Sequence, residues 1–198
     1  AERLSSLEVN EENFHTERDV VKEEFRQSVL APPYGEFGEF IIKQSFTAHP
    51  YKRPTIGNIE ELDASSLEEV RQFHDTFYRP DNAVLVVVGD FDPAQLQRWV
   101  DQYFAPIPKP ETPIPRVTVE EPARTEGRTI REYDAKVLLP ALAVTSPAPK
   151  VASEETAVLT LLAEVLAGGE SSRLYQSLVY IQQLAQSVEF SADLRADA

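Results

Sequence analysis

The segment over residues 10–30 carries the strongest structural signal in the sequence. Asn10 is a preferred N-cap residue, and Glu11 and Glu12 stand in the first turn, where the helix dipole favours negative charge. Pro32-Pro33 ends the segment, because proline lacks a backbone N–H and cannot continue a helix. The sequence therefore predicts a helix that fills residues 10–30.

Two glutamates of this helix share one face. Glu17 and Glu24 are seven residues apart, which is two helical turns and about 10 Å along the axis. Val20 and Val21 lie between them and favour a face turned inward. Carboxylates on such a face need a cation, a metal or a basic side chain. The spacing leaves open a simpler alternative, a solvated surface on which the acids Glu17, Glu23 and Glu24 pair with Arg18, Lys22 and Arg26.

Composition narrows the classes of function. A length of 198 residues with 42% hydrophobic residues is enough for one or two globular domains with a sizeable core. The net charge of −14 argues against nucleic acid or an anionic membrane as partner, because phosphate binding needs clustered Lys and Arg. The lack of cysteine excludes disulfides, Cys-type zinc sites and thiol catalysis. No apolar run reaches membrane-spanning length, and no signal-peptide pattern is visible.

The next part of the chain predicts helices around one strand. We expect a short helix over 39–47, a helix that starts at the capping box Ser65-Ser66-Leu67-Glu68 and closes before Pro80, and a helix over 94–104 capped by Asp92-Pro93. The β-branched run over 83–88 predicts a strand that is buried on both faces.

A proline-rich stretch divides the chain. Residues 105–122 hold six of the fifteen prolines, a density that predicts a stiff connector between domains. Beyond it we expect strands over 128–133, 141–145 and 186–194. Between them we expect a helix over 154–167, capped by Ser153 and ended by Gly168-Gly169, and a helix from Ser171 or Ser172 to residue 183.

Several motifs resemble one enzyme family. The string FHTERDVVKEE resembles the segment that supplies the last zinc ligand in insulinase/pitrilysin-family zinc peptidases. HPYKRPTIGNIEEL and YRPDNAVLVVVGDFD follow in the order found in the catalytic domain of that family. LAGGESSRLYQSLVYIQQLAQSV resembles the start of the non-catalytic repeat that comes next, and the likeness is to the bacterial processing proteases.

The resemblance implies a fold and a domain plan. It implies an α+β fold, with layered α/β peptidase-family domains and a mixed, largely antiparallel sheet covered by helices. Residues 1–105 would be the C-terminal half of a catalytic-type domain, 106–122 a linker, and 123–198 the N-terminal half of a second, non-catalytic repeat. We therefore expect the chain to be an internal piece of a longer protein.

The resemblance also implies site residues. Glu24 matches the zinc ligand of these inverzincins, and Glu17 matches an upstream glutamate that supports the site from behind the ligands. The family places a glycine-containing turn before SRLY against the substrate chamber, which implies a chamber-facing role for Gly168, Gly169, Arg173 and Tyr175. A helix C-cap followed by ordinary inter-helix packing explains these four residues equally well.

The chain departs from the family pattern in its histidines. His15, His49 and His74 are its three histidines, and none of them stands in HxxEH or HExxH. A catalytic zinc needs three protein ligands and an open position, so we expect structural or solvent roles for these side chains. No Ser-His-Asp order, P-loop or dinucleotide-binding glycine pattern is present.

We therefore expect a catalytically inactive piece of a zinc endopeptidase. In the intact parent, the resemblance implies Zn²⁺ held by HxxEH and Glu24, hydrolysis of peptide bonds by metal-activated water, and a peptide or protein substrate. The alternative is a non-catalytic family member that serves as a partner subunit or as a peptide-binding or assembly protein. Expected partners are the missing halves of the parent, a second copy of the chain or a paired family subunit. The resemblance favours a periplasmic location and leaves a cytoplasmic one open.

Overall fold

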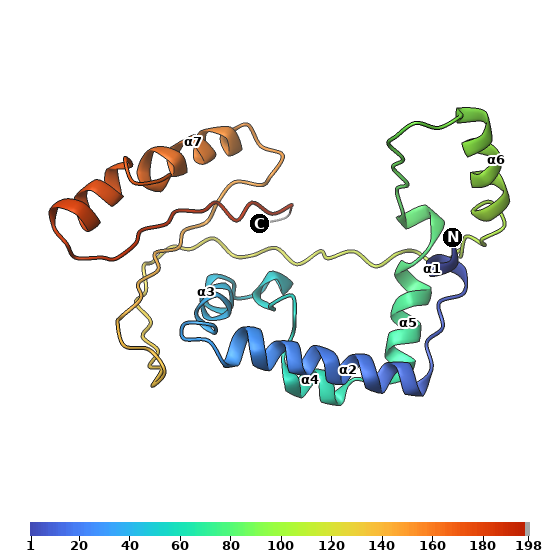
Figure 1. Cartoon of the computed structure of the whole chain (residues 1–198), viewed down its shortest axis with the longest axis horizontal. Helices are drawn as coiled ribbons and strands as arrows, with labels where there is room; N and C mark the ends of the chain where they lie inside the picture. The colour runs from blue at the N-terminus through green and yellow to red at the C-terminus, as the bar shows by residue number, and fades with distance from the viewer. Residues whose placement is uncertain (197–198) are drawn as a thin grey trace. The chain divides into compact units, whose positions relative to one another are not determined.

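The computed structural model describes residues 1–196 of the 198-residue chain, and Figure 1 shows its helices and the long extended segments that join them. Before the proline-rich connector lie α1 (Glu2–Ser5), α2 (Glu11–Phe25), the π-helical η1 (Arg26–Leu30), α3 (Phe37–Ser45), the 3₁₀ turn η2 (Pro50–Lys52), α4 (Ile59–Ala64), α5 (Leu67–Phe77), the 3₁₀ turn η3 (Pro80–Asn82) and α6 (Pro93–Tyr103). After it lie α7 (Glu155–Ala167) and the π-helical η4 (Tyr175–Ile181). Among the described residues, no helix is long and apolar enough to cross a membrane.

The predicted helix over 10–30 is confirmed as α2 followed by η1. The Asn10 side chain accepts a hydrogen bond of 2.9 Å from the backbone N–H of Asn13, as an N-cap should. The π-turn closes with a 2.8 Å hydrogen bond from the N–H of Ala31 to the carbonyl of Arg26. The chain then reverses toward α3 through a turn with Tyr34 at a φ of 62°.

The predicted N-terminal caps of α5 and α6 lie within one residue of the observed caps. The capping box of α5 is formed by Ser66 with Glu69, and it therefore lies one residue later than the predicted Ser65 and Glu68. The predicted cap of α6 is confirmed, because the Asp92 side chain accepts a 2.7 Å hydrogen bond from the N–H of Gln95. In both cases the side-chain oxygen satisfies a helix N–H that has no partner within the helix.

The predicted start of α7 is wrong by one residue, whereas its end is confirmed. Glu154 occupies the N-cap position without a side-chain cap. The Glu155 backbone N–H and the Ser153 hydroxyl both donate hydrogen bonds to the Glu155 carboxylate, and these bonds hold its pKa below the usual range. The helix ends at Gly168-Gly169, and Gly169 has the left-handed φ of 96° that glycine tolerates best.

The predicted sheet is wrong for the residues that the structure describes. Residues 1–196 contain no β-strand, and the segments expected as strands over 83–88, 128–133, 141–145 and 186–194 have no ladder partners. A helix satisfies its backbone groups internally, whereas a strand needs a neighbouring strand. The β-branched run over 83–88 is extended between α5 and α6 (Figure 1), and Val84, Val86 and Val88 are 88%, 75% and 92% exposed.

The expected sizeable core is also absent from the described part of the chain. Its buried apolar side chains are Phe25, Val29 and Leu67. The apolar stripe of α7 is exposed along Val158, Leu161, Leu162 and Val165. Helices bury an apolar face only against a second layer, and residues 1–196 provide no such layer over α7.

Contacts divide the chain into two units. Unit 1 comprises Ala1–Glu39 and Arg53–Thr118, and unit 2 comprises Phe40–Lys52 and the chain from Val119 onward. In unit 1, α4 packs beside α2 (Figure 1), and the Lys22 ammonium lies 2.6 Å from the Asp63 carboxylate. Arg71 of α5 donates two hydrogen bonds to the carbonyl of Val9, and so ties α5 to the residue just before the Asn10 cap of α2.

Unit 2 contains a carboxylate clamp, by which we mean Glu121 with the backbone of residues 47–49. One carboxylate oxygen of Glu121 accepts hydrogen bonds of 2.7 Å from both the N–H and the hydroxyl of Thr47. The other accepts from the N–H groups of Ala48, at 3.0 Å, and His49, at 2.8 Å. Desolvation raises the pKa of Glu121, but these hydrogen bonds outweigh it and lower the pKa to about 2.

Basic side chains join the same two segments of unit 2. Arg124 donates to the carbonyl of Ser45, and Arg128 donates to the carbonyl of Gln44. The Arg195 guanidinium lies over the Phe46 ring, 5.4 Å from its centroid, and over the Tyr51 ring at 4.7 Å. The clamp and these contacts fix the end of the proline-rich connector, Arg124, Arg128 and Arg195 to residues 44–51.

We predict that Glu121→Gln speeds amide exchange at Thr47, Ala48 and His49 by about tenfold, because a neutral amide cannot replace both charge-assisted acceptors. Glu120→Gln, an exposed neighbour, should leave this exchange unchanged. The folded-state pKa lies below the usual 4.5, so the clamp contributes its stability above pH 4.5 and loses it as pH falls toward about 2. Exchange at these amides that is the same in wild type and variant at neutral pH would contradict the clamp.

We predict that Ser66→Ala destabilises the first turn of α5 by about 1 kcal/mol, because it removes the acceptor for the Glu69 N–H. Faster amide exchange at Glu69 would report the loss. Ser65→Ala is the matched control, since the Ser65 hydroxyl donates to the Leu62 carbonyl and caps nothing in α5.

Candidate functional site

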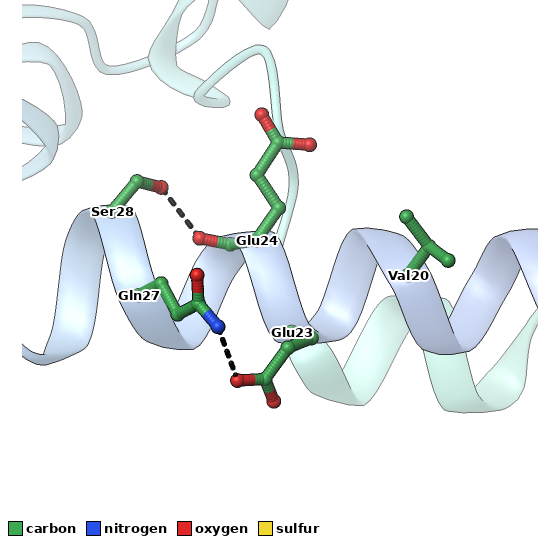
Figure 2. Close-up of a pocket in the computed structure, with 5 residues that line it drawn as sticks. All are labelled: Val20, Glu23, Glu24, Gln27 and Ser28. Atoms are coloured by element: carbon green, nitrogen blue, oxygen red, sulfur yellow. Dashed lines mark hydrogen bonds between the residues drawn. The ribbon is translucent and has the colours of Figure 1, made fainter.

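Glu24 lies on the exposed side of α2 with its carboxylate free. Figure 2 shows this side chain directed away from Glu23, and no hydrogen bond or ion pair within residues 1–196 involves its carboxylate. Its backbone carbonyl accepts a 2.7 Å hydrogen bond from the Ser28 hydroxyl. By contrast, the Glu23 carboxylate accepts from the Gln27 amide at 2.8 Å and lies 3.4 Å from Arg26. Of the two adjacent acids, Glu24 is therefore the one available to bind something else.

The surface around Glu24 is an open depression. Its lining residues, labelled in Figure 2, are Val20, Glu23, Glu24, Gln27 and Ser28. The prediction that this helix face is turned toward the protein interior is wrong for the described chain, because Val20 is 56% exposed. Glu17 is also exposed, and no hydrogen bond or ion pair of its side chain is present within residues 1–196. The face thus presents two unpaired carboxylates and an apolar side chain to solvent.

The helix that carries Glu24 is held in place by an interaction within unit 1. Lys22 is half-buried, and its ammonium donates to Asp63 of α4. The hydrogen bond from Lys22, with the charge of the same side chain, lowers the pKa of the Asp63 carboxyl. The π-helical η1 begins two residues after Glu24, and π-turns inside helices are frequent at functional sites.

The described residues do not form a metal site by themselves. Within residues 1–196, no group of three His, Cys, Asp or Glu side chains is arranged to hold a metal ion. A catalytic zinc requires three protein ligands, so Glu24 fits one position of such a site and the described residues do not complete it. A zinc-dependent step cannot be derived from these residues alone.

The three histidines make their polar contacts with groups other than Glu24. His15 lies 3.3 Å from Glu11 and 3.1 Å from Arg18, and His74 lies 2.8 Å from the Arg3 carbonyl and stacks on Tyr78. His49 is only 1% exposed, and its Nδ1 accepts from the N–H of Tyr51. The structure brings none of them to Glu24 as part of a three-ligand group in the described chain.

The turn at Gly168-Gly169, for which the family resemblance implies a chamber-facing role, is a tight helix end. A Cβ at Gly168 would lie 2.6 Å from the carbonyl oxygen of Glu164, a distance that only glycine avoids. Arg173 is exposed and Tyr175 is half-buried in η4. The chamber-facing role of these residues stays a prediction.

Sequence reasoning missed two residues that anchor long-range contacts. Glu121 binds a backbone segment more than seventy positions earlier, and Arg79 is buried against Asp81 and the carbonyls of Pro110 and Thr112. No local pattern could reveal the Glu121 contact. For Arg79, the short spacing to Asp81 was the one available signal.

The comparison with known proteins decides the family. The protein-family model described as "Peptidase M16 inactive domain" matches residues 65–198. The chain belongs to the M16 peptidase family. This finding confirms the resemblance to insulinase-type zinc peptidases that the sequence motifs indicated.

Relatives of this M16 chain are named as zinc proteases. It is 29% identical over 196 residues to the zinc protease PqqE of Helicobacter pylori, covering 98% of this chain and 44% of that relative. It is 30% identical over 184 residues to an uncharacterized zinc protease of Mycobacterium leprae, covering 92% of this chain and 41% of that relative. The chain therefore spans less than half the length of these relatives.

A solved structure has the same backbone fold over nearly all of this chain. The crystal structure of a protease from Helicobacter pylori superposes with a TM-score of 0.81 and 25% identity, over 98% of this chain and 48% of that one. The long unpaired segments described above therefore have counterparts in a larger folded protein.

Proposed function

We propose that this chain is part of a zinc-dependent endopeptidase in which Glu24 supplies one zinc ligand. The observation that carries the proposal is the exposed Glu24 carboxylate, unpaired on an ordered helix beside a paired Glu23. Membership of the M16 family and relatives named zinc proteases support it. By itself the chain does not hydrolyse peptides, because the described residues lack the other ligands.

The role of this chain is to hold Glu24 in position. The Asn10 cap fixes the start of α2, and the ion pair between Lys22 and Asp63 fixes the orientation of the helix against α4. Glu17 lies two turns away on the same helix and acts as an acceptor for a ligand contributed by another part of the parent. Zinc, when bound, supplies Lewis-acid activation of a water molecule toward a peptide carbonyl.

A peptide or protein is the proposed substrate of the parent. Residues 168–175 face the chamber that encloses it, in keeping with the family motif around SRLY. In this arrangement Gly168 keeps the turn narrow, and the exposed Arg173 offers a donor to backbone or carboxylate groups of the substrate.

A second candidate is a non-catalytic partner subunit of an M16 peptidase. The match to a domain described as inactive favours this reading. In such a protein, the exposed carboxylates of α2 would belong to a charged surface rather than to a metal site.

We predict that the intact parent binds one zinc ion per chain and cleaves an unstructured peptide, and that Glu24→Gln removes most of both. Loss of one anionic ligand should weaken zinc binding by more than about a hundredfold, because loss of a residue that only supports a ligand already costs about 10–100-fold. Metal analysis after dialysis and cleavage of a quenched fluorescent peptide measure the two properties.

Glu23→Gln is the matched control, because Glu23 is the adjacent acid already paired with Gln27 and Arg26. It should leave zinc content and cleavage near wild type, whereas Glu17→Gln should lower both by a smaller factor than Glu24→Gln. A parent that holds no zinc and cleaves no peptide would favour the partner subunit. Equal loss in the Glu23 and Glu24 variants would refute the ligand role of Glu24.

A further inference from the structure

The helix turn that follows Glu24 is anchored by buried side chains. Phe25 and Val29 are two of the three buried apolar side chains of the described chain, at 7% and 9% exposure, and they stand four positions apart. Glu24 and Ser28, each one position earlier, are exposed. Burial of Phe25 and Val29 therefore fixes the rotation of the helix about its axis, and with it the side from which Glu24 projects.

Val29 belongs to the π-helical η1, which the ordinary helical ladder does not hold. A π-turn pairs an N–H with the carbonyl five positions earlier instead of four, as the N–H of Ala31 does here with Arg26 at 2.8 Å. Pro32-Pro33 comes next and provides no N–H for the carbonyls of Ser28 and Val29. The Ala31 bond and the packing of the following turn must hold η1 instead.

That following turn lies against the backbone of η1 at Gly35. The Gly35 N–H donates to the Pro32 carbonyl at 3.1 Å, directly after Tyr34 with its left-handed φ of 62°. A Cβ at residue 35 would lie 2.2 Å from the carbonyl oxygen of Val29 and 3.0 Å from its carbonyl carbon. Both are backbone atoms, which cannot swing aside as the end of a flexible side chain can. Any side chain at residue 35 would therefore push η1 and the turn apart.

A shift of η1 reaches Glu24 over a short path. The Ser28 hydroxyl donates to the Glu24 carbonyl at 2.7 Å (Figure 2). The upstream part of α2 is held against α4. Because Phe25 and Val29 are buried together, a displaced η1 rotates the last turn of α2, and this turn carries Glu24.

We propose that Gly35 is a positioning residue for the Glu24 carboxylate. Its missing side chain lets the turn close on η1, and η1 in turn fixes the direction in which Glu24 points. A group in a metal or catalytic site must be held within roughly 0.5 Å of its working position, so a small displacement is enough to matter. The inference rests on the proposed function, because the direction of Glu24 affects zinc binding only if Glu24 is a ligand.

The test compares Gly35→Ala with Gly38→Ala in the intact parent. Gly38 is the matched control, because a Cβ there would meet nothing within 4 Å. Gly35→Ala should lower the zinc affinity by about 10–100-fold, the range for loss of a residue that supports a ligand, and Gly38→Ala should leave it unchanged. Competition with a chromophoric chelator measures the affinity, at a temperature where circular dichroism shows each variant to be folded.

A double-mutant cycle with Glu24→Gln separates positioning from a general loss of stability. If Gly35 acts through Glu24, Gly35→Ala should cause no further loss of zinc affinity in the Glu24→Gln background. A merely structural role predicts the same loss in both backgrounds. Ser28→Ala is a second variant on the same path, and because Ser28 is exposed it should fold. It should lower the zinc affinity by a smaller factor than Gly35→Ala, and again only when Glu24 is present.

Hydrogen exchange in the metal-free parent tests the first step by itself. With EDTA present, the Ala31 amide that closes the π-turn should exchange about tenfold faster in Gly35→Ala than in wild type. Gly38→Ala should not change this rate. The readout contains no zinc, so it reports on the turn whether or not Glu24 is a ligand.

Several outcomes would overturn the proposal, and they differ from failure of the proposed function. Unchanged Ala31 exchange in Gly35→Ala would show that the turn does not hold η1. Additive losses in the cycle, or a zinc affinity that neither Gly35→Ala nor Ser28→Ala alters while Glu24→Gln abolishes it, would refute positioning and leave Glu24 as a ligand. Zinc binding that survives Glu24→Gln would refute the proposed function, and this inference with it.

Discussion

Satisfaction of backbone hydrogen bonds is the constraint on which the rest of this structure depends. A helix meets it within its own segment, and α2, α5, α6 and α7 do so with caps or glycine ends close to the predicted positions. A strand meets it only with a neighbour. The apolar run over 83–88 is therefore extended and exposed, and the described chain forms no sheet and buries few apolar side chains.

Within each unit, buried or half-buried charged groups join segments that no sheet or second apolar layer holds together. Arg79 gathers the Asp81 carboxylate and two connector carbonyls in unit 1, and Lys22 joins α2 to α4. In unit 2, Glu121 binds three consecutive N–H groups and a hydroxyl. Charge-assisted hydrogen bonds of this kind are strong enough to position extended segments that have no sheet to hold them.

The same arrangement leaves the Glu24 carboxylate exposed, and no metal site forms among the described residues. The Glu24 carboxylate is unpaired and exposed on a helix that local and long-range contacts orient. The remaining ligands of a zinc site are not gathered by the described residues. The chain belongs to the M16 family and spans under half the length of its relatives, and these two findings are the basis for the proposal that another part of the protein completes the site.

The sequence alone predicted α2, α5, α6 and α7 to within one or two residues, and the family, because helix signals are local and the motifs stand in a fixed order; α1 and α4 were not predicted. The spacing placed Glu24 and Glu17 on one helix face, and only the family resemblance implied their roles in a zinc site, which stay a prediction. Whether the segment over 83–88 is a strand was decided only by the tertiary structure, since a β-branched run favours extended backbone but cannot supply its own partner. The tertiary structure likewise decided that Val20 is exposed and that Glu121 reaches residues 47–49, because both depend on which distant segments are present to pack.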